Sequence, residues 1–282
     1  MDRVCWNITN VCNDNCNFCF REGKSNPVSL QTAYVIIDNL FCSGIKHIAF
    51  SGGEALMYDG IYELLEYVCS LGLEITLITN CILLNDKCLE KLKNIVEWIA
   101  IPIDCFENNI MYGRNIHHIK NVERSLKCIE QSDKNVSVKI NTVLTSKNYN
   151  NIMTIYSYIH NFKCVKRWNI FEFVDIRGNA IQNSNTYQLT LEQLEYVKQC
   201  LKGRDMDKRL RVVLKSRKTL ISSYIVINPE GLIVIYNENT KQEDVLGDLK
   251  REKLSEIIDR NYIKYDLNCY EKRIGENNLI FV

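Results

Sequence analysis

The stretch Cys12-Asn13-Asp14-Asn15-Cys16-Asn17-Phe18-Cys19 places three thiols in one short loop, with a C-x3-C-x2-C spacing. Thiolates are the usual ligands of iron in [4Fe–4S] clusters, so this spacing predicts a loop that wraps a cubane. Three ligands leave one iron open, and an open position is where a substrate or cofactor can coordinate. The alternatives are a zinc knuckle or buried free thiols, although a structural zinc site requires four ligands.

Two further motifs close apolar segments of strand length. Phe50-Ser51-Gly52-Gly53-Glu54-Ala55 ends the run that begins at Ile45, and Leu77-Ile78-Thr79-Asn80-Cys81 ends the run that begins at Leu73. A cluster loop after the first strand, a GGE motif after the second and a TN turn after the third resemble the radical S-adenosylmethionine (SAM) superfamily. This resemblance implies an enzyme with a [4Fe–4S] cluster and S-adenosyl-L-methionine as cofactors.

The periodicity of apolar residues predicts strands that alternate with helices. The expected strands are Val4–Thr9, Ile45–Phe50, Leu73–Thr79, Trp98–Ile103, Val136–Leu144 and Trp168–Val174. The expected helices are Leu30–Cys42, which Ser29 would cap, Asp59–Leu71, Asp86–Val96, Asn121–Gln131 and Tyr149–Phe162. Strict alternation favours a parallel sheet with right-handed crossovers. We therefore predict an α/β fold, a partial (β/α)6 TIM-like barrel of the radical SAM type, with all three motifs at the carboxyl ends of strands, where such folds carry chemistry.

In the last third of the chain, strands and helices no longer alternate regularly. We expect a loop over Asp175–Gln188, a helix over Thr190–Lys202, a hairpin formed by Ser222–Asn228 and Gly231–Tyr236, and a helix over Lys250–Asp259. The prediction is one structural domain, with a radical SAM core over residues 1–180 and a C-terminal extension over residues 181–282. This extension should cover the active site and close the open side of the barrel.

Composition sets broad limits on function. The chain has 282 residues and a net charge of +1, which argues against a broad nucleic-acid-binding surface but allows a local basic pocket. Outside the first motif the cysteines are scattered singly, and Met1-Asp2-Arg3 leads directly into a strand-like segment rather than a signal peptide. Without an apolar run long enough to span a bilayer, we expect a cytoplasmic monomer with no membrane or nucleic-acid partner.

The GGE motif and its surroundings allow two interpretations. Gly52 and Gly53 would let the backbone approach a ligand closely, or would form an ordinary turn. Glu54 would face a positively charged cofactor, or would stabilise the N-terminus of a helix. Phe18 would shield the cluster or pack beside adenine, and either place is compatible with core packing.

Four basic residues in separate segments indicate an anionic ligand. Lys24 follows the cluster loop, Arg114 follows the fourth strand, Lys139 lies within the fifth and Arg167 opens the sixth. Lys139 shares a strand face with Asn141, and a buried ammonium is costly unless an anion pairs with it. A salt bridge to a nearby Asp or Glu is the alternative for Lys139. Several cations that converge on one cavity would suit a phosphate-bearing ligand.

Further segments resemble the viperin-like branch of the superfamily, in the same order and with similar spacing from about Val4 to Leu249. They are Trp6–Thr9, the three cysteines with Phe20, Lys24–Ser25, Phe50–Glu54, Gly113–His117, Lys139–Leu144, Arg167–Phe171 and Ser223–Val226. Viperin-like enzymes convert a ribonucleoside triphosphate (CTP, UTP or GTP) to its 3′-deoxy-3′,4′-didehydro analogue, an antiviral chain terminator. The resemblance implies that a 5′-deoxyadenosyl radical abstracts the C4′ hydrogen and that the 3′-hydroxyl leaves as water.

The matching positions imply roles for individual residues. Substrate would be bound by Lys24, Arg114, Lys139, Arg167, Asn169 and Tyr224, with Lys139 and Tyr224 also acting in catalysis. The cofactors would be contacted by Phe18, Ser51, Gly52, Gly53, Glu54, Asn80 and Asn141, with the cluster itself on Cys12, Cys16 and Cys19. A reducing donor such as flavodoxin or ferredoxin would supply electrons. Tyr224 has the alternative of an ordinary strand aromatic.

The chain departs from the patterns it resembles at a few positions. Ala55 replaces the Pro that usually follows GGE, and Cys81 replaces the Gly of the third motif. Compared with the animal viperins, Pro102 stands where a Ser that contacts the cofactor is expected, and Asn169 stands in place of a Lys. The chain resembles the prokaryotic type, without the amphipathic membrane-binding N-terminus of the animal proteins.

Two other functions stay open. A different radical SAM enzyme would act on a peptide, a cofactor precursor or another nucleotide. Peptide-modifying members often carry a C-terminal cysteine cluster, whereas the cysteines beyond Cys164 are Cys200 and Cys269, far apart in the sequence. A metal-binding regulatory module would require zinc in place of iron and would not cleave S-adenosyl-L-methionine.

Overall fold

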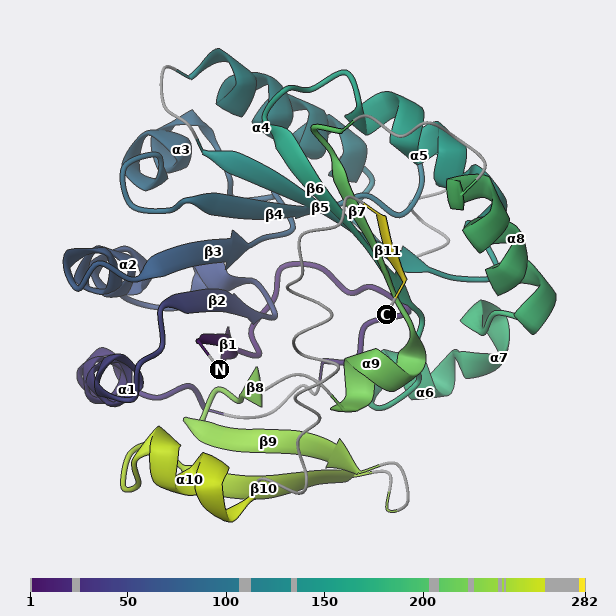
Figure 1. Cartoon of the computed structure of the whole chain (residues 1–282). Helices are drawn as coiled ribbons and strands as arrows, with labels where there is room; N and C mark the ends of the chain where they lie inside the picture. Colours follow the sequence, from purple (N-terminus) through teal and green to yellow (C-terminus); the bar gives the residue numbers. More distant parts are fainter. Residues whose placement is uncertain are drawn as a thin grey trace.

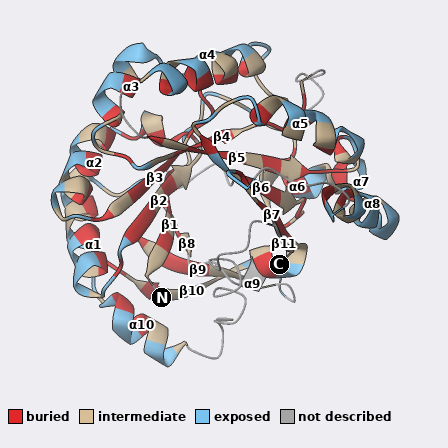
Figure 2. Ribbon diagram, turned by 45° about the horizontal axis from the view of Figure 1, so that its top comes forward, coloured by how far each residue is buried: buried red, intermediate tan, exposed pale blue. Residues whose placement is uncertain are grey.

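The computed structural model describes residues 2–21, 26–106, 113–132, 136–202, 208–222, 226–237, 240, 242–261 and 279–281. Within these ranges eleven strands form one sheet, in the order β10-β9-β8-β1-β2-β3-β4-β5-β6-β7-β11. The sheet curves around the middle of the molecule, and the larger helices cover its outer side (Figure 1). In the turned view of Figure 2, exposed residues lie on the outward faces of these helices.

Consecutive parallel strands form the middle of the sheet. They are β1 (Arg3–Thr9), β2 (His47–Gly52), β3 (Glu74–Ile78), β4 (Trp98–Pro102), β5 (Ser137–Leu144) and β6 (Val165–Glu172). Each strand pairs in parallel with the next, which confirms the α/β prediction. The carboxyl ends of these strands therefore meet at one edge of the sheet, where the three motifs lie.

The helices between these strands bury one apolar face each. They are α1 (Leu30–Cys42), α2 (Ile61–Ser70), α3 (Asp86–Leu92), α4 (His118–Gln131) and α5 (Ile152–Ile159), with 3₁₀ turns at Ala55–Met57 and Tyr149–Asn151. Ser29 caps α1 as expected, because its side chain accepts a hydrogen bond from the Thr32 N–H. The strands present their apolar side chains to these helices: Val138 and Ile140 are fully buried in the main core. This leaves Lys139 and Asn141 on the inner face of β5.

The last third of the chain extends the sheet at both edges. Its elements are α6 (Gly178–Gln182), α7 (Ser184–Tyr187), α8 (Leu191–Lys202), β7 (Arg211–Lys215), α9 (Arg217–Ser222), β8 (Val226–Ile227), β9 (Leu232–Asn237), β10 (Gln242–Asp248), α10 (Leu254–Arg260) and β11 (Leu279–Phe281). β8 pairs with β1 and carries the β8–β9–β10 meander, while β7 pairs with β6 and β11 pairs with β7.

The structure corrects two expectations for this region. The sheet begins at β10 and ends at β11, so the described strands do not close a barrel. The segment Asp175–Gln188, expected to be a loop, contains the short helices α6 and α7. The hairpin is confirmed as the antiparallel pair of β8 and β9. The division into a core over residues 1–180 and an extension that covers the site stays a prediction.

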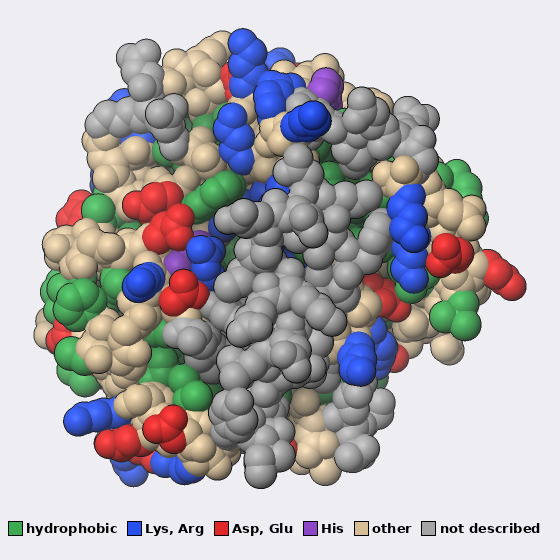
Figure 3. Space-filling model, viewed as in Figure 1, with side chains coloured by type: hydrophobic (Ala, Val, Ile, Leu, Met, Phe, Trp, Pro, Cys, Tyr) green, Lys and Arg blue, Asp and Glu red, His purple; other side chains and the backbone are tan. Residues whose placement is uncertain are grey.

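On the face in Figure 3, several Lys and Arg side chains gather at the top, and acidic and basic side chains are interspersed along the left side. The chain as a whole has a net charge of +1. Among the described residues, none of the helices combines the length and the apolar character that crossing a bilayer requires.

Candidate active site

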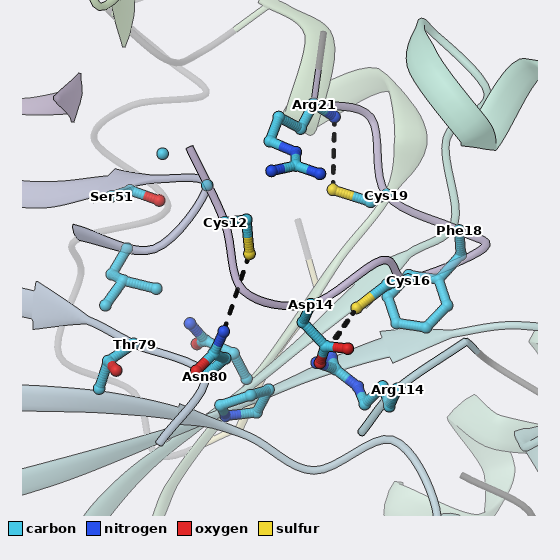
Figure 4. A pocket seen from close by; sticks show the side chains of 15 residues that line it. Cys12, Asp14, Cys16, Phe18, Cys19, Arg21, Ser51, Thr79, Asn80 and Arg114 are labelled. Atoms are coloured by element: carbon cyan, nitrogen blue, oxygen red, sulfur yellow. Dashed lines mark hydrogen bonds between the residues drawn. The ribbon is translucent and has the colours of Figure 1, made fainter. Parts of the chain in front are cut away.

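The three cysteines of the first motif line one cavity. It measures about 170 Å³ and lies at the carboxyl ends of β1 to β4, with Ser51, Thr79 and Pro102 in its wall. The sulfurs of Cys12, Cys16 and Cys19 point into this space from the surrounding loop (Figure 4). We call it the thiol cavity.

The donor set of the thiol cavity fits a [4Fe–4S] cluster. Among the described residues, no three His, Cys, Asp or Glu side chains surround a single metal position. In a cubane each thiolate binds a different iron, so the three sulfurs need not converge on one point. Burial raises the pKa of Cys12 and raises that of Cys16 to about 12, and Arg114 partly opposes this rise at Cys16. A thiol must lose its proton to bind iron, and the nearby guanidinium favours that loss.

Arg114 belongs to the thiol cavity. Its Nε donates to Asp104 Oδ2 at 2.8 Å, its Nη1 donates to Cys16 Sγ at 3.6 Å, and its guanidinium lies 5.1 Å from the ring centroid of Phe18. The Arg114 and Asp104 side chains are 7% and 1% exposed, so this is a buried ion pair. The structure therefore places Arg114 beside the predicted cluster ligands and not with the other predicted phosphate-binding cations.

Gly52 and Gly53 fasten the cluster loop to β2. The N–H of Gly53 donates to Thr9 O at 2.7 Å, and the N–H of Glu54 donates to Val11 O at 2.9 Å. A Cβ on Gly53 would lie 2.2 Å from Val11 O, and a Cβ on Gly52 would lie 2.2 Å from Thr9 O. The neighbour that requires glycine here is thus the backbone of the cluster loop, in addition to any ligand.

Glu54 and Asn80 form hydrogen bonds within the protein. Glu54 is fully buried, and its carboxylate accepts from the N–H of Leu56 at 3.1 Å and from the N–H of Asn80 at 2.7 Å. This is the helix-capping alternative of the sequence analysis. The Asn80 amide Nδ2 donates to Asn13 Oδ1 at 2.7 Å and lies 3.8 Å from Cys12 Sγ. Both residues connect the third motif to the cluster loop, and their predicted contacts with S-adenosyl-L-methionine stay predictions.

Two asparagines of the α6–α7 segment bind the cluster loop from the opposite side. Asn179 Nδ2 donates to Cys16 O at 3.1 Å, and Asn183 Nδ2 donates to Asn17 O at 3.1 Å. Sequence reasoning missed them because the segment resembled a loop. Their i, i+4 spacing is the available signal, since it places both amides on one side of a helical turn.

Phe18 packs in the core and also reaches the wall of the thiol cavity. Its side chain is 6% exposed and packs edge-on against Tyr187, with ring centroids 6.1 Å apart. It also lines the thiol cavity. Core packing is therefore compatible with a place beside the three cysteines, and its predicted contact with the cluster or adenine stays a prediction.

A second cavity of about 150 Å³ lies deeper along the inner face of the sheet. Its wall holds five basic side chains, those of Arg3, His47, Lys139, Arg167 and Lys215, and we call it the cation cavity. Ile78 and Asn141 belong to the walls of both cavities, so the two spaces adjoin. The strand order explains this convergence, because residues far apart in the sequence lie on neighbouring strands.

Lys139, one of the predicted phosphate-binding cations, is buried in the wall of this cavity. It is 9% exposed, its Nζ donates to Thr76 Oγ1 at 2.8 Å, and the Nζ lies 4.3 Å from the ring centroid of Trp98. Burial and the charge of Arg167 lower its pKa to about 7. Among the described residues no carboxylate forms an ion pair with Lys139, unlike the salt-bridge alternative.

Arg167, Asn169 and Asn141 form a hydrogen-bonded row across β6 and β5. Arg167 Nε donates to Asn169 Oδ1 at 2.9 Å, and Asn169 Nδ2 donates to Asn141 Oδ1 at 2.9 Å. This row runs from the cation cavity to the boundary with the thiol cavity. The side chains predicted for substrate and for cofactor are therefore physically connected.

The remaining predicted residues and one missed residue complete the site. Ser51 lines the thiol cavity. Lys24 and Tyr224 lie outside the described residues. Lys215 on β7, which is 4% exposed with its Nζ 4.6 Å from the ring centroid of Phe171, lines the cation cavity although the sequence analysis assigned it no ligand. The strand β7 is short and flanked by charged residues, so the sequence pattern did not predict a strand with an inward-facing Lys215.

A sequence profile described as the radical SAM superfamily matches residues 6–159, more than half of the chain. An S-adenosylmethionine-dependent nucleotide dehydratase of Lacinutrix mariniflava is 28% identical over 81% of this chain, which spans 49% of that protein. A protein with the same name from Selenomonas ruminantium is 23% identical over 96% of this chain and 98% of its own length.

A solved structure shares the fold. The structure of anSMEcpe with bound AdoMet matches with a TM-score of 0.70 and 16% identity, over 96% of this chain and 84% of that one. At this level of identity the likeness concerns the arrangement of strands and helices.

Proposed function

The chain belongs to the radical SAM superfamily, and on this premise we propose that it is a nucleotide dehydratase that converts a ribonucleoside triphosphate to its 3′-deoxy-3′,4′-didehydro form. The observation that carries this proposal is the junction of the two cavities. Basic side chains line one cavity and the cysteine thiols line the other, with Asn141 and Ile78 shared between them. The names of the two relatives support the same reaction class.

The cation cavity suits a polyphosphate. Lys139, Arg167 and Lys215 come from the adjacent strands β5, β6 and β7, and all three line its wall. Buried cations are unfavourable unless anions compensate them, and an oligophosphate supplies several negative oxygens in a small volume. Arg167 can offer a planar pair of N–H donors, whereas each Lys acts as a point charge. Phosphates bound by Arg167 and Lys215 would place the ribose beside Lys139 and Asn141, towards the thiol cavity.

Cys12, Cys16 and Cys19 would hold the [4Fe–4S] cluster, and Ser51, Gly52 and Asn141 would contact S-adenosyl-L-methionine. When bound, the cluster and S-adenosyl-L-methionine supply the 5′-deoxyadenosyl radical that removes a hydrogen atom. The protein's own contribution is to orient the ribose and to exclude water from the reacting atoms.

Departure of the 3′-hydroxyl as water requires one proton and one electron. With a pKa lowered to about 7, Lys139 can hold or release a proton near neutral pH. In the proposed step the C3′–O bond breaks and the leaving oxygen takes the proton of the Lys139 ammonium. A reduced flavodoxin or ferredoxin would supply the electron.

The test is an anaerobic activity assay. The cluster is reconstituted, reductant and S-adenosyl-L-methionine are added, and 5′-deoxyadenosine is measured with CTP, UTP, GTP or ATP in turn. We expect one triphosphate to stimulate 5′-deoxyadenosine formation strongly and to yield a product lighter by one water. Slow cleavage that is indifferent to all four would refute the nucleotide substrate while leaving the superfamily membership intact.

A further inference from the structure

A continuous row of hydrogen bonds connects Lys139 to Glu74. Lys139 Nζ donates to Thr76 Oγ1 at 2.8 Å, and Thr76 Oγ1 lies 2.7 Å from His47 Nε2. His47 Nδ1 lies 2.9 Å from Glu74 Oε2. His47 and Glu74 open β2 and β3, so the row runs from the amino-terminal edge of the sheet to the wall of the cation cavity. We call it the Glu74–Lys139 row.

The partners of the row limit what each of its atoms can donate or accept. The contact with His47 and the charge of Arg3 lower the pKa of Glu74 to about 2, so its carboxylate is charged and can only accept. His47 Nδ1 lies 2.9 Å from Glu74 Oε2 and also 2.9 Å from Arg3 Nη1, so the tautomer of the ring decides whether Nδ1 donates to the carboxylate or accepts from the guanidinium. Burial lowers the pKa of His47. In either tautomer the Thr76 oxygen has a lone pair for the Lys139 ammonium, because a hydroxyl oxygen can accept two hydrogen bonds.

The charges around Lys139 make its hydrogen bond to the Thr76 oxygen important for keeping the ammonium protonated. Arg167 on β6 and Arg3 on β1 disfavour the ammonium, and Glu74 on β3 favours it. His47 on β2 and Lys139 disfavour each other's protonated forms. Lys215 on β7 adds a further cation to the same cavity wall. Within the described residues, Thr76 supplies the hydrogen-bond acceptor that Nζ contacts.

The row is well shielded at its inner end and open at its outer end. Thr76 and His47 are 3% and 5% exposed, whereas the side chain of Glu74 is 37% exposed. Hydrogen bonds in a low-dielectric interior are stronger, and an unpaired buried donor is correspondingly costly. Removing the Thr76 hydroxyl should therefore act on the Lys139 ammonium more than on the rest of the fold.

We propose that Thr76 is a positioning residue for Lys139, which holds its ammonium in the cation cavity and sets the pH range over which it can donate a proton. The identity of the proton acceptor, a leaving hydroxyl of the nucleotide, rests on the proposed function. The hydrogen-bonded row and its effect on Lys139 do not depend on that function. The experiment therefore has one readout without substrate and one with it.

The decisive comparison is Thr76→Val against Thr76→Ser. Val keeps the shape of the side chain and removes the hydroxyl, while Ser restores the hydroxyl. The first readout is an NMR titration of the Lys139 side chain in lysine-labelled, cluster-free protein, with the signal assigned by its loss in Lys139→Met. A hydrogen bond to a charged group is worth about one pH unit or more, so the Lys139 midpoint should move down by that amount in Thr76→Val. In Thr76→Ser the midpoint should stay near that of the natural protein.

The second readout is the pH dependence of triphosphate-dependent 5′-deoxyadenosine formation. Because the ammonium is the active form, the alkaline limb of kcat should move to lower pH by the same amount in Thr76→Val. Below both midpoints kcat should recover, and a defect of structure alone would not produce this recovery. If Thr76→Val does not fold, Thr76→Ala removes the same hydroxyl in a smaller side chain and should shift the midpoint in the same direction.

The outcomes separate the two proposals. An unchanged Lys139 midpoint in Thr76→Val, or an equal shift in Thr76→Ser, overturns the positioning role. A shifted midpoint without turnover of any nucleotide supports the positioning role and refutes the proposed function. A shifted midpoint with a matching shift of the kcat profile supports both.

Discussion

Replacement of Gly53 by Ala tests whether the GGE motif holds the cluster loop. The new Cβ would lie 2.2 Å from Val11 O, where contacts shorter than 3.0 Å essentially never occur, so the loop must move by roughly 0.8 Å. Forcing an extra carbon into a packed site costs about 1–3 kcal/mol. Loss of the hydrogen bond from Glu54 N–H to Val11 O adds about 1 kcal/mol. We expect the free energy of unfolding of the cluster-free protein to fall by about 2–4 kcal/mol.

The assay combines urea unfolding with iron and sulfide content after reconstitution. Because Val11 precedes Cys12, displacement of the loop should reduce the bound iron of Gly53→Ala to less than half that of the natural protein. Gly44→Ala is the matched control, since Gly44 has a φ of 81° but nothing within 4 Å of a new Cβ. It should lose about 1–2 kcal/mol of stability from backbone strain yet keep its full iron content. Full iron and unchanged stability in Gly53→Ala would refute the reasoning.

Other predictions address the cluster, the ion pair and the cation cavity. Cys16→Ala should prevent cluster assembly, because one of three ligands is lost, and a full iron complement in this variant would contradict the assignment. Lys139→Met should weaken triphosphate binding about tenfold or more in calorimetry, since a charged hydrogen bond is lost, while substrate-independent cleavage of S-adenosyl-L-methionine persists. Asp104→Asn should lower the free energy of unfolding by about 3–5 kcal/mol, because the buried Arg114 charge loses its partner, and a change within error would count against the ion pair. Glu74 has a pKa lowered from 4.5 to about 2, so its stabilising contribution is present above pH 4.5 and is lost as the pH falls towards 2. Acid unfolding of Glu74→Gln over this range should be less steep, and an identical profile would exclude the contribution.

Many elements of the fold depend on short stretches of sequence, and for this reason the sequence predicts them. The apolar spacing on α1 and α2 places one buried face on each helix, and the observed cores of both helices match that spacing. Strand and helix alternate through β6, and this alternation leaves few arrangements other than a parallel sheet. The three cysteines of the cluster loop are local in the same sense, because they lie within eight consecutive residues and line one cavity.

The elements that were missed depend on distant contacts. The helices α6 and α7 are short and polar. Asn179 in α6 and Asn183 between the two helices bind the cluster loop, more than 160 residues earlier in the chain. The strand β7 has five residues and is defined as a strand by its pairing with β6. No periodic pattern of that length separates a strand from a loop, so its Lys215 was not placed in the cavity.

The sequence by itself determined the family resemblance, the cluster loop and the predominantly parallel arrangement of the sheet. Only the tertiary structure decided how the polar side chains divide their contacts. It directs both oxygens of Glu54 to backbone amides, pairs Arg114 with Asp104 beside Cys16, and brings Lys139 to Thr76. The physical reason is that apolar periodicity and motif spacing depend on residues close together in the sequence. Charge compensation and hydrogen bonding instead depend on side chains from different strands that become neighbours only in the folded protein.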